Sequence, residues 1–227
     1  MSELIYILLA IVDLGLVLVA LRAGLQWLYT HVIVNLLLVT ILAGKVTYIL
    51  GFPVTVASPL YATVYLATDI IAEHFGTKSS LLVVRMGFGA ILLFVGVSQI
   101  CLLFPVLSSQ SELQISMEKV LKTSMRVFIA STVAYVVSQH FDIFVYDKVK
   151  KITNGRYLWL RNNVSTISSQ FIDSGLFFGI AFIGVLPNWW KIAIAGFLTK
   201  VFIAILDTPF IYLSRWFVQQ RIQDTAK

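Results

Sequence analysis

Seven long apolar runs divide this 227-residue chain and leave few folds open to it. About 20 apolar residues make a helix long enough to cross the hydrocarbon core of a bilayer. Runs near that length cover residues 4–21, 32–50, 60–75, 81–107, 122–145, 164–186 and 190–213. Only 12% of the residues are charged, against about 25% in soluble globular domains. The sequence therefore predicts an all-α integral membrane protein of about seven spans with no sizeable soluble domain.

The backbone of these runs is expected to be helical throughout. Only α-helices and closed β-barrels satisfy every backbone hydrogen bond within lipid, and the alternating ten-residue pattern of barrel strands is missing. We therefore expect a purely helical bundle. The first run contains Asp13 and no basic segment precedes it, so we interpret it as a retained helix rather than a signal peptide. Pro53 and Pro59 precede the third run, where we expect a hinge or a discontinuous helix.

Basic residues at the ends of the runs indicate the orientation. The net charge is +6, and Lys and Arg in short loops mark the cytoplasmic side of a membrane protein. With seven spans, eleven such residues fall on the side of the 148–161 loop and four on the other. The prediction is an external N-terminus and a cytoplasmic C-terminus. Residues 108–121 then form an external loop, either an amphipathic lid or a solvated connector.

Ionisable residues are unexpected inside apolar runs, yet several occur here. The eight are Asp13, Lys45, Asp69, Glu73, Asp142, Asp173, Lys200 and Asp207. At mid-membrane each costs about 2.5 to 3.5 kcal/mol on insertion scales, so each is expected to face a partner, water or a ligand. Asp13 is interpreted as an interfacial or packing residue. Asp69 and Glu73 lie four residues apart on one helix face, where two carboxylates repel unless cations lie opposite.

Polar residues also recur at helical spacing. On the sixth run Asn162, Thr166, Gln170 and Asp173 share one helix face. The fifth run carries a stripe of the same length, and the second, third and seventh runs carry shorter ones. Serines and threonines alone are typical of helix packing, but stripes that include ionised groups indicate one shared polar interior. Aromatic residues in or near the striped runs are able to stack on a planar ligand: Phe75, Tyr135, Phe171, Phe177 and Phe178.

Two segments carry a resemblance to a known family. Residues 65–76, YLATDIIAEHFG, and residues 161–174, RNNVSTISSQFIDS, resemble the two hallmarks of the queuosine precursor transporter family, also called the vitamin uptake transporter family, and Lys200 also fits. The resemblance covers roughly residues 30–218. It implies a six-helix transporter domain over 30–218, preceded by an additional transmembrane helix in 1–29 and followed by a cytoplasmic tail, 219–227. It also implies a multi-pass protein of the cell membrane, akin in architecture to the substrate-binding components of energy-coupling-factor importers.

The implied substrates are 7-cyano-7-deazaguanine and 7-aminomethyl-7-deazaguanine, precursors of the tRNA nucleoside queuosine. A carboxylate accepts the N1–H and the amino group of such a base together, a role for Asp173 or Asp69. Donors for the base carbonyl are available from Lys200, Lys45, Asn163 or Gln170. The predicted substrate-binding set is Asp69, Glu73, Asp173, Gln170, Lys200, Lys45, Asn163, Asn35, Phe75 and Asp207.

Other classes of function find little support in the sequence. It has no Walker motif, nucleophile elbow or H-E-x-x-H pair. Cys101 is the single cysteine and the three histidines lack metal-ligand spacing, so we expect neither an enzyme nor a metal or cofactor site. Nucleic-acid binding is not expected. The alternative is a substrate-binding component of an energy-coupling-factor importer, which works only with partner ATPases. The resemblance neither requires such an ATPase module nor excludes it. A homodimer is compatible with the sequence, but no strong motif supports it.

Overall fold

Helices dominate the computed structural model, which describes residues 2–49, 51–121, 125–185, 187 and 189–225. The helices are α1 (Ser2–Ala23), α2 (Leu25–Leu42), α3 (Ser58–His74), α4 (Thr77–Cys101), α5 (Ser111–Leu121), α6 (Met125–Ile152), α7 (Leu158–Phe182) and α8 (Trp189–Thr225). Two short strands, β1 (Val46–Ile49) and β2 (Phe52–Thr55), and a 3₁₀ turn, Ser108–Gln110, complete the described elements. Among them α1, α2, α4, α6 and α8 are long and apolar enough to cross a membrane.

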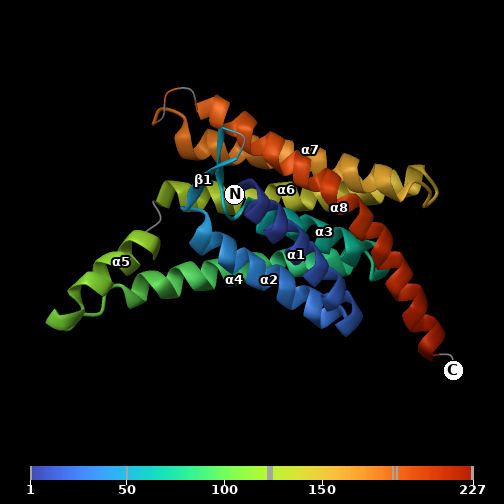
Figure 1. Cartoon of the computed structure of the whole chain (residues 1–227), viewed down its shortest axis with the longest axis horizontal. Helices are drawn as coiled ribbons and strands as arrows, with labels where there is room; N and C mark the ends of the chain where they lie inside the picture. The colour runs from blue at the N-terminus through green and yellow to red at the C-terminus, as the bar shows by residue number, and fades with distance from the viewer. Residues whose placement is uncertain (1, 50, 122–124, 186, 188, 226–227) are drawn as a thin grey trace.

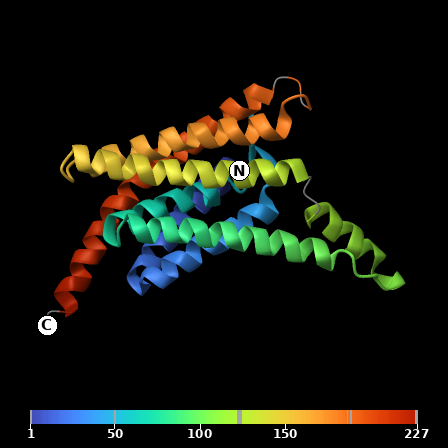
Figure 2. The same ribbon diagram turned by 180° about the vertical axis from the view of Figure 1, so that it is seen from behind.

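The short helix α3 forms the centre of the bundle. It packs against α1, α2, α4, α6, α7 and α8, and all of its residues from Ser58 to Ala72, apart from Tyr61, are buried. Figure 1 shows α6 and α7 on one side of α3 and α2 and α4 on the other, while α1 and α8, which pack against each other, cross close to α3. Seen from behind, α6 (yellow-green) and α7 (orange) run side by side in opposite directions along most of their length (Figure 2). Polar side chains on α3 therefore face other helices on every side.

A β-hairpin replaces the end of the predicted second span. Helix α2 ends at Leu42, and β1 then pairs antiparallel with β2, with Val46 opposite Thr55 and Tyr48 opposite Pro53. The expectation of a purely helical bundle is wrong here. The physical reason lies in the sequence VTYI, which is rich in β-branched and aromatic residues, and in Gly51, whose φ of 81° suits glycine at the turn.

Helix α3 is continuous, without the expected break. Pro59 lies in its first turn, where a missing backbone N–H removes no helical hydrogen bond. Pro53 lies in β2, so the interruption that the prolines indicate is the hairpin that precedes the helix. In α8 the helix also passes through Pro209 and continues to Thr225, and the predicted tail, as far as the structure describes it, belongs to this helix.

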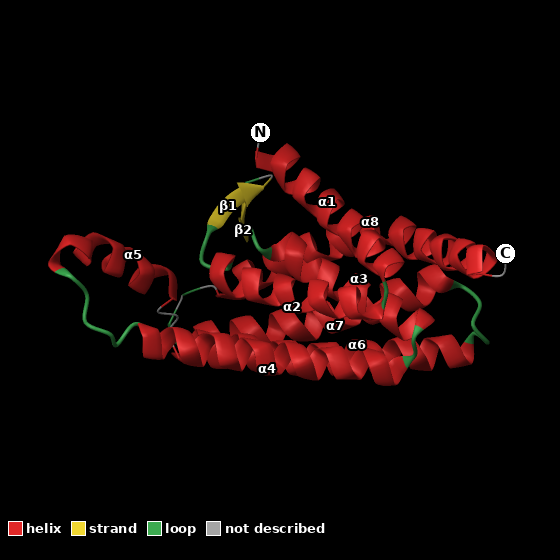
Figure 3. Cartoon of the chain, turned by 90° about the horizontal axis from the view of Figure 1, so that it is seen from below, coloured by secondary structure: helices red, strands yellow, loops and turns green. Residues whose placement is uncertain are grey.

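The first helix belongs to the packed core of the bundle. Leu14, Val17 and Leu21 of α1 are at most 2% exposed, and α1 packs against α2, α3 and α8. Helix α5, in contrast, buries none of its residues and extends away from the bundle (Figure 3). The predicted 108–121 loop is thus largely a helix, and it does not cover the bundle.

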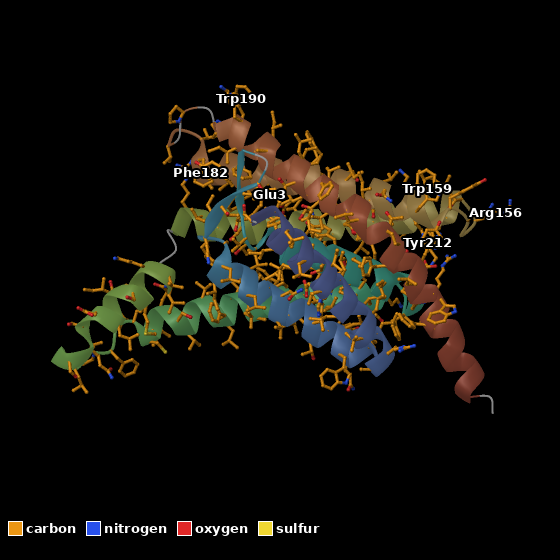
Figure 4. The ribbon with its side chains drawn as sticks, in the orientation of Figure 1. Glu3, Arg156, Trp159, Phe182, Trp190 and Tyr212 are labelled. Carbon is orange, nitrogen blue, oxygen red and sulfur yellow. The ribbon has the colours of Figure 1, made fainter. Side chains whose placement is uncertain are left out.

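Aromatic side chains mark the two ends of the α7–α8 pair. Figure 4 shows Trp159 and Tyr212 together at one end and Phe182 and Trp190 at the other, and the Trp159 backbone N–H donates to the Tyr212 hydroxyl at 3.3 Å. Trp and Tyr are enriched where membrane proteins meet the two lipid–water interfaces. Aromatic residues at both ends of α8 agree with its being long and apolar enough to cross a membrane.

Candidate functional site

Three aspartates from three helices meet in the middle of the bundle, and we call them the acidic centre: Asp69 of α3, Asp142 of α6 and Asp207 of α8. Asp69 and Asp142 are fully buried and Asp207 is 1% exposed. The carboxyl groups of Asp69 and Asp142 lie within hydrogen-bonding range of each other, and Asp207 is within electrostatic range of both. Burial of three acidic side chains in one place is costly unless something compensates their charge.

Helix α7 supplies one neutral donor to each aspartate. The bonds are Thr166 Oγ1 to Asp69 Oδ2 at 3.5 Å, Ser169 Oγ to Asp142 Oδ1 at 2.8 Å, and Asn162 Nδ2 to Asp207 Oδ1 at 2.8 Å. All three donors lie on the inward face of α7, as their spacing in the sequence predicts. The contact to Asp69 is long, so Asp69 is the least satisfied of the three.

Several polar atoms at this place have no hydrogen-bond partner among the described residues. They are Asp69 Oδ1, Asp142 Oδ2, Asp207 Oδ2, Asn162 Oδ1 and both amide atoms of Gln170. The ion pairs found in the described part of the chain do not include the acidic centre. Buried polar atoms in native proteins are nearly always paired. A cluster rich in free acceptors is therefore suited to a ligand that brings hydrogen-bond donors or positive charge.

The predicted site residues Asp173 and Lys200 form a separate, satisfied cluster. The Lys200 ammonium pairs with Asp173 Oδ2, and the other oxygen accepts from the Tyr61 hydroxyl at 2.7 Å and from Ser138 Oγ at 3.2 Å. The ammonium also lies 5.0 Å from the centre of the Tyr61 ring. With both charges matched, this cluster has less capacity for a new ligand than the acidic centre.

Glu73 is surrounded by cations. Its Oε1 lies 2.6 Å from Nη2 of both Arg161 and Arg215, while Oε2 lies 2.9 Å from the Lys150 ammonium and 3.1 Å from the Tyr146 hydroxyl. We call these residues the Glu73 cluster. Cations therefore lie opposite Glu73, as its spacing from Asp69 required, and they tie α3 to α6, α7 and α8.

Asn35 belongs to a different polar network on the other side of α3. Its Nδ2 donates to Asp13 Oδ2 at 2.7 Å and to Thr63 Oγ1 at 3.0 Å, and it lies 3.1 Å from His31 Nε2. Asp13 is 4% exposed, which agrees with its interpretation as a packing residue. The network joins α1, α2 and α3.

The structure does not bring three other predicted residues to the acidic centre. Lys45 is exposed just before β1, and Phe75 is 37% exposed at the end of α3. Asn163 donates to Thr208 Oγ1 at 2.8 Å and borders an open apolar groove on the outer side of α7. Of the aromatic residues considered for stacking, Phe171 is 67% exposed.

Residues that the predicted binding set omits also contribute to the centre. Asp142 and Asn162 both lie on polar stripes that are visible in the sequence. Tyr65 and Tyr146, which are at most 1% exposed, are within electrostatic range of Asp142 and of Asp69, respectively. Tyr65 is the first residue of the first hallmark segment. That position is a sequence signal for Tyr65, whereas helical periodicity alone does not distinguish it from its neighbours.

Comparison with known proteins identifies the family. Residues 55–214 match the model of a family described as "Putative vitamin uptake transporter". The chain belongs to this family. It is a transporter of the multi-pass membrane type and not an enzyme, and the whole acidic centre lies within the matched residues.

Two curated relatives carry the same name, "Probable queuosine precursor transporter". The relative from Bacillus subtilis (strain 168) is 32% identical over 174 residues, which cover 75% of this chain and 76% of the relative. The relative from Haemophilus influenzae (strain ATCC 51907 / DSM 11121 / KW20 / Rd) is 27% identical over 152 residues, 63% of this chain and 60% of the relative. No solved structure matches the chain.

Proposed function

We propose that this vitamin uptake transporter family member imports queuosine precursors, 7-cyano-7-deazaguanine, 7-aminomethyl-7-deazaguanine or both, and binds the base at the acidic centre. The names of the two relatives support the substrate class. One structural observation supports the place: three buried carboxylates, each with an unpaired oxygen and none with a cationic partner among the described residues. A guanine-like base offers the adjacent N–H donors that these acceptors lack.

Asp69 is the best anchor for the base. Among the described residues its Oδ1 has no hydrogen-bond partner and its Oδ2 accepts a long, 3.5 Å contact from Thr166, whereas Asp142 and Asp207 each accept one hydrogen bond of 2.8 Å. A carboxylate with both oxygens available accepts the N1–H and the 2-amino group in a bidentate pair. The other two aspartates then meet the rest of the ligand.

Gln170 is the partner we propose for the base carbonyl. It follows Thr166 by one helical turn on the inward face of α7 and is 1% exposed, and its Nε2 has no hydrogen-bond partner in the described part of the chain. Replacing the guanine-like edge by an adenine-like one exchanges donors for acceptors and leaves buried groups unpaired, which sites of this kind discriminate against strongly.

The seven-span arrangement remains part of the proposal, with α3 and α7 as the two crossings beyond the five long apolar helices. The Glu73 cluster supports the proposed orientation. It gathers Lys150, Arg161 and Arg215 at one end of the bundle, and an excess of cations marks the cytoplasmic side. We therefore propose that the N-terminus is external and that the C-terminus is cytoplasmic.

Restoration of queuosine in tRNA tests this function in cells. The host is a strain that neither makes nor imports the precursors, supplied with either 7-deazaguanine, with queuosine in tRNA measured by mass spectrometry. We expect the parent chain to restore queuosine and Asp69→Asn to abolish it. Asp147→Asn, which removes a partly exposed aspartate paired with Lys151, is the matched control and is expected to restore it.

Two results would change the proposal. No restoration by the parent chain, together with thermal stabilisation of the purified protein by an unrelated small molecule, would refute the substrate. Restoration only when the ATPases and scaffold of an energy-coupling-factor importer are present would instead favour the alternative, a substrate-binding component of such an importer.

A further inference from the structure

The acidic centre contains more carboxylates than one base requires. If Asp69 accepts the guanine-like edge, Asp142 and Asp207 remain, both buried and each with an unpaired oxygen. Asp142 comes from α6, its carboxyl group lies within hydrogen-bonding range of that of Asp69, and Ser169 of α7 donates to its Oδ1. Two neighbouring buried carboxyl groups are able to share one proton, as pairs of aspartates do in other proteins.

The groups around this pair do not neutralise it. Asp207 of α8 adds a third acid, and Tyr65 of α3 and Tyr146 of α6 add neutral hydroxyls. On α7, Nη2 of Arg161 pairs with Glu73 while its Nε has no described partner, and Asp173 pairs with Lys200. Helix α4 also packs against α6, but its Arg85 is exposed. None of the ion pairs found among the described residues includes Asp69 or Asp142.

Asn162 gives an independent indication of a ligand at this place. Its side chain is fully buried and points at the centre, because its Nδ2 is bonded to Asp207. Its Oδ1 has no described partner, so a further donor is missing. Two neighbouring carboxyl groups bind a proton between them without further ligands.

We propose that the Asp69–Asp142 pair is a proton-binding site that couples import of the base to the transmembrane proton gradient. The inference rests on the proposed function and adds its energy source. One proton from the external solution binds at Asp142 Oδ2, which leaves Asp69 ionised to accept both N–H donors of the base. The proton and the base are then released together into the cytoplasm, and no covalent bond of the base changes.

Proteoliposomes that contain the purified full chain test the coupling. The probe is radiolabelled 7-cyano-7-deazaguanine, whose 7-substituent is uncharged, with the membrane potential clamped to zero. Exchange without a pH gradient measures transport itself, and the steady-state accumulation ratio with acid outside measures coupling. With one proton per base, a gradient of one pH unit supports accumulation of up to about tenfold.

The accumulation ratio is an equilibrium quantity, so it does not depend on how fast a variant transports. We expect the parent and the matched control Asp147→Asn to approach tenfold, and Asp142→Asn to approach a ratio of one. Exchange by the parent without accumulation, or equal accumulation by Asp142→Asn, would overturn the proton site but not the transporter. Absence of exchange by the parent would refute the proposed function, and the coupling with it.

A second measurement decides the matter if Asp142→Asn fails to fold. A pH-sensitive dye trapped in weakly buffered vesicles reports proton entry when the unlabelled base is added to the parent protein. Acidification of the lumen in proportion to base uptake is the expected result. Uptake of the base without any change of internal pH would overturn the proposal.

Discussion

Removing the charge of Glu73 should destabilise the protein strongly, because this residue neutralises a fully buried cation. Arg161 is 0% exposed, its Nε has no described partner, and Glu73 lies 2.6 Å from its Nη2. Breaking a buried pair by removing one partner costs about 3–5 kcal/mol. The side chains of Lys150 and Arg215 are 34% and 38% exposed, so each of these pairs adds only about 0–1 kcal/mol.

The assay is thermal unfolding of purified Glu73→Gln in detergent, followed by tryptophan fluorescence. For a chain of this size about 1 kcal/mol corresponds to 2–4 °C, so we expect the melting temperature to fall by roughly 10 °C. Lys150→Gln, which removes one partly exposed partner, should lower it by less than about 4 °C. The double variant Glu73→Gln/Arg161→Met should recover part of the loss, since no buried cation remains. Equal melting temperatures for Glu73→Gln and Lys150→Gln would refute this reasoning.

Three further predictions concern packing, the α1 network and transport. A Cβ on Gly87 would lie 2.5 Å from a leucine carbon of α2 and 2.6 Å from a tyrosine hydroxyl of α6, so Gly87→Ala should cost about 1–3 kcal/mol. Gly89 has nothing within 4 Å of that position, and equal melting temperatures for Gly87→Ala and Gly89→Ala would contradict the close packing. Asp13→Ala removes the carboxylate that accepts from both Asn35 and Thr63 and should cost about 1–3 kcal/mol in the same assay, and an unchanged melting temperature would mean that the network is dispensable. In the uptake assay Lys200→Met should impair transport because Asp173 loses its cation, whereas the exposed Lys45→Ala should change uptake by no more than about twofold. The reverse order would place the site near the hairpin.

The apolar runs predict the helices well because lipid leaves the backbone few alternatives. The failure lies at the end of the second run, where hydropathy does not distinguish an apolar strand from an apolar helix. Val46 and Tyr48 are 61% and 67% exposed on the hairpin, and their β-propensity, together with Gly51, is the only local signal of it. Helix α3 contacts six other helices. Its surroundings are therefore protein rather than lipid, so the length of its apolar run need not match the thickness of a bilayer.

Helical spacing predicts which face of a helix is polar, but it does not predict which charges meet. The sequence places Asp69 and Glu73 on one face, and the structure separates their roles. Glu73 meets three cations, whereas Asp69 meets another carboxyl group. Likewise, Asp142 belongs to the site because Thr166 and Ser169 of α7 donate to Asp69 of α3 and to Asp142 of α6, respectively. Such pairings depend on which helices are neighbours in space, and the periodicity of one helix carries no information about its neighbours.

Binding of 7-cyano-7-deazaguanine to the purified protein, measured by isothermal titration calorimetry, tests the proposed base-binding site most directly. A hydrogen-bonded charged group contributes about 1.5–3 kcal/mol, so Asp69→Asn should weaken binding by roughly 10- to 100-fold. Asp147→Asn should leave the affinity unchanged. Parent-like affinity of Asp69→Asn would contradict binding of the base at the acidic centre.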